Sequence, residues 1–385
     1  MTKGFALFAL GFRPFFACAG MGAVVLLALW LCLWGGHIPP NAYYGGIGWH
    51  SHEMLFGYTA AVIAGFLLTA VRNWTGIDTI RGTPLAALAA LWLLGRILPF
   101  LPLPGGLTAL VDLAFLPLLA LALYGPLMQG EAKANRVFLP LLALAAGANL
   151  LVHLQALGIS TGTALLGTGM MRYLIIWLIL IITARVMPFF TRSALPGATP
   201  QNRDLVERSS AILLLGLMAA DLFMPAPWLV APLAALLALS QIIRVAGWYD
   251  RRIWTVAILW VLYSGYFWLI AGFLLQALSA MRLIAPNLAL HAITMGAIGI
   301  LTLGMMARVA LGHTGRPMRS ARITNAAFVL LNLGTAVRVL LPVIAPRQYQ
   351  LWVFVAGGLW VTGFLIYCGV YLPILARPRA DGLPG

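Results

Sequence analysis

Long apolar stretches separated by short polar connections run along the whole chain. Each stretch has about 18 to 25 residues, which is enough for an α-helix to cross the hydrocarbon core of a bilayer. The pattern predicts an all-α polytopic membrane protein with about twelve transmembrane helices, and residues 1–385 are expected to form a single integral membrane domain. The predicted segments are 15–36, 48–71, 84–101, 105–127, 137–157, 163–190, 207–224, 227–247, 254–277, 286–311, 323–343 and 349–375.

The basic residues gather on one side of these segments. If Lys3 and Arg13 lie in the cytoplasm, the connections on that side hold most of the Lys and Arg, whereas opposite connections such as 37–48 and 101–105 hold none. Because basic residues concentrate on the cytoplasmic side of membrane proteins, both termini are predicted to lie inside.

Composition supports this interpretation, since 62% of the residues are hydrophobic and only 9% are charged, against about 25% charged in soluble proteins. The net charge of +15 is then explained by the basic residues on the cytoplasmic side of the membrane. Nucleic acid is therefore not an expected partner. The first apolar run is too long for a cleavable signal peptide. The three cysteines show no metal or redox spacing.

Five of the six histidines fall on the predicted outer side. They are His37, His50, His52, His153 and His291. Asn149 lies one turn below His153 on the same helix face, and only His313 is predicted to be cytoplasmic. Imidazole is a common ligand of metals and haem, so the cluster predicts a cofactor site near the outer surface.

His50 and His52 are about 200° apart on a helix, so they cannot both face one point. We expect His52 to belong to the core site because it shares a pattern with His291. Each is followed five residues later by a glycine, Gly57 or Gly296, which lets a planar cofactor or another helix approach closely. The other histidine is left for a second metal or a hydrogen bond.

Costly charged residues occur in the same outer half of the predicted helices. They are Glu53, Arg96, Asp112, Arg172, Asp221 and Arg338. Intramembrane charges usually serve function or form buried pairs, so Arg172 is a candidate ion-pair partner for Asp112 or Asp221. Arg96 and Arg338 occur in similar contexts, LGRILP and AVRVLLP. They either snorkel to the interface or hold the carboxylates of a cofactor such as haem propionates.

The inner ends of the second, sixth and tenth segments look alike. Each carries Ala-(Val)-Arg followed by a loop rich in Gly, Thr or Pro. A likeness at every fourth segment predicts three four-helix units around a pseudo-threefold axis.

Three motifs carry a resemblance to the NnrS family: GFRPFF at 11–16, HSHEMLFGYTAAVIAGFLLTAVRNWTG at 50–76 and HAITMGAIGILTLGMMARVALGHTGRP at 291–317. The resemblance covers most of the chain. It implies a polytopic inner-membrane protein of proteobacteria, associated with denitrification and nitric-oxide (nitrosative) stress and containing haem and copper.

In that light, haem is expected between the second and tenth segments, ligated by His52 and His291 or by one of them. The expected haem is b-type. The chain contains no CxxCH, so a c-type cytochrome that donates electrons would be a separate protein, and a quinol is the other possible donor. Nitric oxide or another diatomic would be the partner. The arginines expected around the cofactor are Arg96, Arg172 and Arg338. The candidate copper ligands are His50, His153, His37 and, as a soft ligand of Cu(I), Met54.

The helix arrangement is also similar to the catalytic subunit of haem–copper oxidases and nitric oxide reductases. Two differences weaken that analogy: the sixth and seventh segments hold no histidine, and His-x-His stands on the second segment instead of the tenth. Fold analogy alone assigns no function. Two alternatives to NO binding or reduction stay open, a non-catalytic sensor or metal-protective protein and a twelve-helix transporter.

Overall fold

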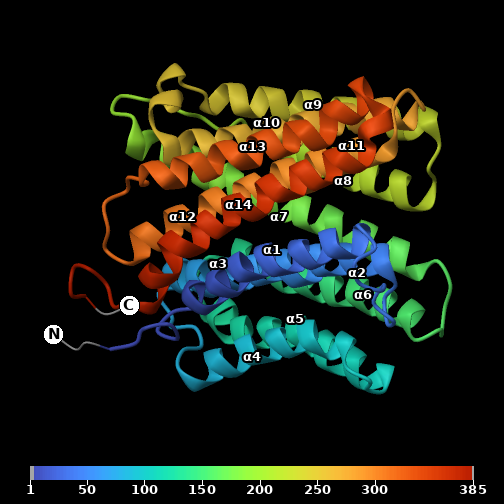
Figure 1. Cartoon of the computed structure of the whole chain (residues 1–385). Coiled ribbons are helices and arrows are strands. Elements are labelled where there is room, and N and C mark those ends of the chain that lie inside the picture. Colours follow the sequence, from blue (N-terminus) through green and yellow to red (C-terminus); the bar gives the residue numbers. More distant parts are fainter. Residues whose placement is uncertain (1–3, 384–385) are drawn as a thin grey trace. The chain divides into compact units, whose positions relative to one another are not determined.

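The computed structural model describes residues 4–383, and each of the twelve predicted segments within them is helical (Figure 1). Lys3, which the predicted topology used, lies outside the described residues. The main helices are α1 (Phe12–Trp34), α2 (Gly46–His52), α3 (Ala60–Thr75), α4 (Thr83–Ile97), α5 (Gly105–Gln129), α6 (Phe138–Ala156), α7 (Thr163–Ala194), α8 (Asp204–Phe223), α9 (Pro227–Trp248), α10 (Ala257–Ala280), α11 (Pro286–His291), α12 (Ile300–His313), α13 (Arg322–Ile344) and α14 (Tyr349–Ala376). Short 3₁₀ turns are η2 (Leu98–Phe100), η3 (Lys133–Val137), η4 (Arg251–Thr255) and η6 (Pro346–Gln348).

Eleven helical segments among the described residues are long and apolar enough to cross a membrane. The predicted all-α polytopic membrane fold is therefore confirmed. The remaining predicted segment, α8, is helical but carries Asp204, Glu207, Arg208 and Asp221. The two acidic residues in its first turn favour helix formation through the helix dipole, but the charges make α8 the most polar of the twelve.

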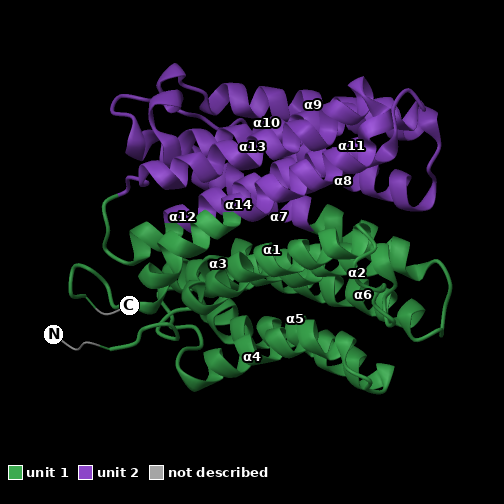
Figure 2. Cartoon of the chain, in the orientation of Figure 1, with its two compact units in different colours: residues 1–174, 309–317, 364–385 green, residues 175–308, 318–363 purple. Residues whose placement is uncertain are grey.

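The chain divides into two compact units (Figure 2). Unit 1 comprises residues 1–174, 309–317 and 364–385, and unit 2 comprises residues 175–308 and 318–363. The expectation of one membrane domain over residues 1–385 stays a prediction.

Two membrane segments are more enclosed than the other candidate spans of the described residues. In unit 1, α1 packs on α3, while α4, α5 and α6 pack in succession. In unit 2, α10 packs on α9 and α11, and α13 packs on α11. The span Gly46–Thr75 is 83% buried in its apolar window and the span Pro286–His313 is 72% buried. These two segments, the second and the tenth, are the ones that carry His52 and His291.

Both enclosed segments change from α-helix to π-helix directly after their histidine. The π-helical turns are η1 (Glu53–Thr59) after His52 and η5 (Ala292–Gly299) after His291. Such turns are uncommon and frequently mark functional sites. The backbone therefore supports the likeness between the second and tenth segments. The sixth segment, α7, is an uninterrupted α-helix, and the arrangement of three four-helix units stays a prediction.

The GHTGRP loop after α12 holds the C-terminal tail within unit 1. Ala380 N donates to Thr314 O at 2.9 Å, and the Arg379 guanidinium donates to His313 O at 3.1 Å. Gly315 has φ +68, a left-handed conformation that glycine adopts without strain. The His313 ring packs 5.6 Å from the Phe12 ring. The loop therefore has a structural role in joining the tail to the helices of unit 1.

Candidate metal centre

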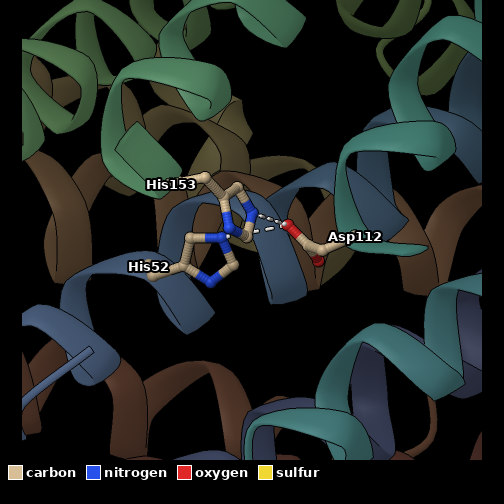
Figure 3. A group of neighbouring side chains, drawn as sticks. All are labelled: His52, Asp112 and His153. Carbon is tan, nitrogen blue, oxygen red and sulfur yellow. Dashed lines mark hydrogen bonds and ion pairs between the residues drawn. The ribbon is translucent and has the colours of Figure 1, made fainter. Parts of the chain in front are cut away.

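Three side chains from three helices of unit 1 converge on one point (Figure 3). His52 comes from α2, Asp112 from α5 and His153 from α6, and one ligand atom of each lies within 4.8 Å of the others. Asp112 Oδ2 lies 3.1 Å from His52 Nε2 and 3.0 Å from His153 Nε2. All three side chains are buried, with 0%, 4% and 0% of their surface exposed. Two imidazoles and a carboxylate form a donor set that suits a divalent metal ion.

Asn149 completes the inner ring of donors. Its Nδ2 donates to Asp112 Oδ2 at 2.8 Å, and its Oδ1 lies 3.0 Å from His52 Nε2. The prediction that Asn149 shares a helix face with His153 is confirmed, because both side chains point from α6 to the same carboxylate.

The outward nitrogens of the two histidines are also held. His52 Nδ1 lies 3.0 Å from Glu53 Oε1, and His153 Nδ1 lies 2.9 Å from the Tyr43 hydroxyl. A carboxylate or hydroxyl on the far nitrogen of a ligating histidine is typical of metal sites, since it fixes the ring and raises its basicity. The inward nitrogen of each ring is then directed at Asp112 Oδ2.

The charges of the group favour a bound cation. Arg96 forms ion pairs with Glu53, at 2.9 Å, and with Asp112. With neutral histidines, these two carboxylates and one guanidinium leave one negative charge in excess inside an apolar environment. Buried charge must be compensated. A metal ion bound between His52, Asp112 and His153 would supply the missing positive charge.

Glycines make room for the Arg96 ion pairs. A Cβ on Gly57 would lie 2.6 Å from Arg96 Nη1 and 2.9 Å from Glu53 Oε2, and a Cβ on Gly95 would lie 2.7 Å from Asp112 Oδ1. The absence of a side chain at Gly57 therefore leaves space for the guanidinium of Arg96. At the matching position of unit 2, a Cβ on Gly296 would lie 2.8 Å from Trp268 Cβ and 3.0 Å from Thr335 Cγ2, so this glycine admits the neighbouring helices, the second of the two expected roles.

Two tyrosines of the connection before α2 cover the histidines. The Tyr44 hydroxyl lies 3.2 Å from His52 Nε2, and the Tyr43 hydroxyl contacts His153. Burial raises the pKa of Tyr43 to about 12. Burial and, second, the negative charge of Glu53 raise the pKa of Tyr44 well above its usual value of 10. Both hydroxyls therefore keep their protons at neutral pH.

The structure groups the histidines differently from the sequence-based prediction. His153, expected in a second site, lies in the same group as His52. The half-buried His50 ring stacks on Trp30 with centroids 4.3 Å apart, and it is outside this group. His37 is exposed. Met54, the soft ligand considered for copper, is half-buried in η1, and its role stays a prediction.

His291 and Arg338 lie in unit 2. His291 Nδ1 donates to Asn287 O at 2.7 Å, so its Nε2 carries the lone pair. The buried Arg338 donates through Nη2 to the Tyr349 hydroxyl at 2.8 Å, while its Nη1 and Asn287 Oδ1 have no hydrogen-bond partner within residues 4–383. Arg172 packs over the Tyr173 ring at 4.9 Å. The roles of His291, Arg338 and Arg172 as cofactor ligands stay predictions, as does a haem shared by His52 and His291.

The sequence pattern identified Asp112 as a costly membrane charge but did not predict it as a possible ligand. Tyr43 and Tyr44 were not predicted as part of the site. The signal for Asp112 was its position one helix before His153, at the same predicted depth. The signal for the tyrosines was NAYYGG, an Asn-initiated turn immediately before the histidine helix.

Together, the membrane helices and the buried histidine–carboxylate group define a polytopic membrane protein with a candidate metal site. A family model described as NnrS protein matches residues 6–379, nearly the whole chain. The chain therefore belongs to the NnrS family, as the three motifs indicated. No curated protein matches this chain.

Proposed function

We propose that this protein is a metalloprotein of the nitric-oxide response that binds NO at a metal ion held by His52, Asp112 and His153. The observation that carries the proposal is the convergence of two imidazole nitrogens and a carboxylate oxygen in a buried site. Membership of the NnrS family supplies the nitric-oxide context. In the topology favoured by the basic residues, with both termini in the cytoplasm of a bacterial inner membrane, this site faces the periplasmic side.

The donor set favours a particular range of metals. Imidazole and carboxylate suit Cu²⁺, Fe²⁺ and Zn²⁺, whereas Cu⁺ prefers the sulfur of Cys or Met. Copper, which the family resemblance implies, therefore fits this site in its oxidised form. A soft site for Cu⁺ would need Met54 in addition.

Haem fits unit 2 better than the His52 group. The inward nitrogen of His52 and the guanidinium of Arg96 are both engaged by carboxylates in unit 1. In unit 2, His291 presents a lone pair at Nε2, and the buried Arg338 Nη1 has no acceptor in the described part of the chain. His291 would hold b-type haem and Arg338 would bind a propionate. A bound haem would supply an iron centre for a diatomic ligand.

Whether NO is reduced or only bound depends on whether a donor supplies electrons to the site. Reduction of two NO molecules to N₂O needs two electrons and two protons, and a separate cytochrome or quinol would have to supply the electrons. A sensor or metal-protective protein would use the same ligands without turnover.

Metal analysis and the absorption spectrum of the purified protein test the proposal. We expect one equivalent of a transition metal that is lost in His153→Ala, and a Soret band that is lost in His291→Ala but kept in His153→Ala. Gln155→Ala, an exposed change on the same helix, is the matched control and should keep both. A metal-free wild-type protein would contradict the proposal and leave the transporter as the alternative. Anaerobic NO consumption with a reductant separates an enzyme from a sensor.

A further inference from the structure

The segment Asn41–Gly45 holds a tyrosine against the candidate metal site. Asn41 is 5% exposed, and its Oδ1 accepts hydrogen bonds from the backbone N–H of Tyr43 and of Tyr44, both at 3.0 Å. Its Nδ2 donates to Pro99 O at 3.1 Å, which ties the segment to η2. An asparagine that bonds to backbone N–H groups ahead of it fixes a tight turn. Asn41 therefore sets where both tyrosine rings lie.

The two tyrosines contact different sides of the histidines. The Tyr44 hydroxyl lies 3.2 Å from His52 Nε2 and 3.5 Å from His153 Nε2, the two nitrogens that face Asp112. Its ring stacks on the His52 ring, with centroids 4.3 Å apart and an interplanar angle of 22°. Among the hydrogen bonds of the described residues, the Tyr43 hydroxyl contacts only the outward Nδ1 of His153.

We propose that Tyr44 is the residue of this site that donates a hydrogen bond to a small ligand bound at the metal, an inference that rests on the proposed metal site. Asn41 and Tyr43 act as positioning residues, the first for the Tyr44 hydroxyl and the second for the His153 ring. The hydroxyl reaches the inner nitrogens of both histidines, and the inner side has no other hydroxyl in the contacts of the described residues. A small ligand with a lone pair, such as NO or azide, is the class that such a donor selects.

The test uses full-length protein loaded with Co²⁺, whose visible spectrum reports both metal binding and added azide. Tyr44→Phe should bind Co²⁺ with wild-type affinity but bind azide about tenfold more weakly, because one hydrogen bond to a charged ligand is lost. Asn41→Ala should weaken azide binding in the same direction, since the hydroxyl is present but no longer held.

Two further variants separate positioning from ligand contact. Tyr43→Phe should weaken Co²⁺ binding about tenfold or more, as expected when the partner of a ligating histidine is removed, while the loaded fraction binds azide normally. Tyr124→Phe, an exposed tyrosine on α5, should change neither quantity.

Equal azide affinity in Tyr44→Phe and wild type would overturn the inference. Loss of Co²⁺ from Tyr44→Phe would also overturn it, because Tyr44 would then be a metal ligand. A wild-type protein that binds no Co²⁺ would instead overturn the metal site itself, and the two failures are thus distinguished.

Discussion

The two π-helical regions share a backbone plan and differ in charge. In each, a short α-helix ends at a histidine, a π-helical turn follows, and a glycine stands five residues after the histidine. Next to His52 stands Glu53, whereas next to His291 stands Ala292. The carboxylate of Glu53 contacts the ring of His52, and the ring of His291 contacts a backbone carbonyl instead.

The arginines show the consequence of this difference. Arg96 is paired with the carboxylates of Glu53 and Asp112. Arg338, in a similar local sequence context, donates to the Tyr349 hydroxyl, and its Nη1 has no acceptor among residues 4–383. Because the two carboxylates of Glu53 and Asp112 face the one guanidinium of Arg96, that region favours a bound cation. In unit 2, Arg338 Nη1 has no acceptor among the described residues, and this region favours a ligand with an anionic group. One scaffold thus supports two kinds of site.

Replacement of Asp112 by asparagine should have the largest effect on this comparison. Asp112→Asn removes a metal ligand and one of the two carboxylates that pair with the buried Arg96. Because Glu53 still compensates Arg96, we expect loss of bound metal and a fall in the free energy of unfolding of about 1.5–3 kcal/mol, the contribution of a hydrogen bond between charged groups. Metal analysis and thermal unfolding in detergent measure both. The control is Asp250→Asn, whose carboxylate pairs with Arg252 in a loop and should leave both quantities unchanged. Undiminished metal in Asp112→Asn would remove the assignment of the ligand.

Glu53→Gln tests the carboxylate that distinguishes the two regions. The amide keeps the shape of the side chain but no longer compensates Arg96 or supports the His52 ring, so metal affinity should fall about 10- to 100-fold. A competitive titration with a chelator gives the affinity. Ala292→Ser, at the matching position in unit 2, should leave the metal affinity unaltered. An affinity equal to wild type in Glu53→Gln would show that Glu53 serves only the ion pair.

The two glycines provide a matched pair of smaller changes. Gly57→Ala places a methyl group against the Arg96–Glu53 ion pair, and Gly296→Ala places one against Trp268. Both should destabilise the fold by about 1–3 kcal/mol through overpacking. Only Gly57→Ala should also lower metal content, which metal analysis of the two purified variants compares. Equal metal loss in both would mean that general destabilisation, and not the ion pair, controls the site.

The smallest effect is expected from Arg338→Gln. Without the guanidinium, the anionic group of a ligand in unit 2 loses its charged partner, so haem content should fall several-fold while the metal content of unit 1 is unchanged. Haem is quantified from the Soret band after purification. Arg338→Lys keeps the charge but not the planar pair of donors, and it should retain an intermediate amount. Full haem in Arg338→Gln would exclude Arg338 as the propionate partner.

Much of the fold, and several polar residues of the candidate site, could be predicted from the sequence. Apolar length locates the helices because a bilayer requires a minimum span, and the cost of membrane charges drew attention to Arg96 and Asp112. The family was recognisable from its motifs. The partner of Asp112 was not predictable: Asp112 pairs with Arg96, whereas the sequence offered Arg172 as an ion-pair partner of Asp112 or of Asp221.

The sequence by itself determined the helices, the family and which polar side chains must serve a purpose inside a membrane. Only the tertiary structure decided that His52 meets Asp112 and His153, residues 60 and 101 positions further along the chain. Helix periodicity relates side chains on one helix, but the distance between atoms on different helices depends on how α2, α5 and α6 pack. The π-helical turn, the Asn41 turn and the glycines beside Arg96 are features of that packing, and together they make three distant residues one site.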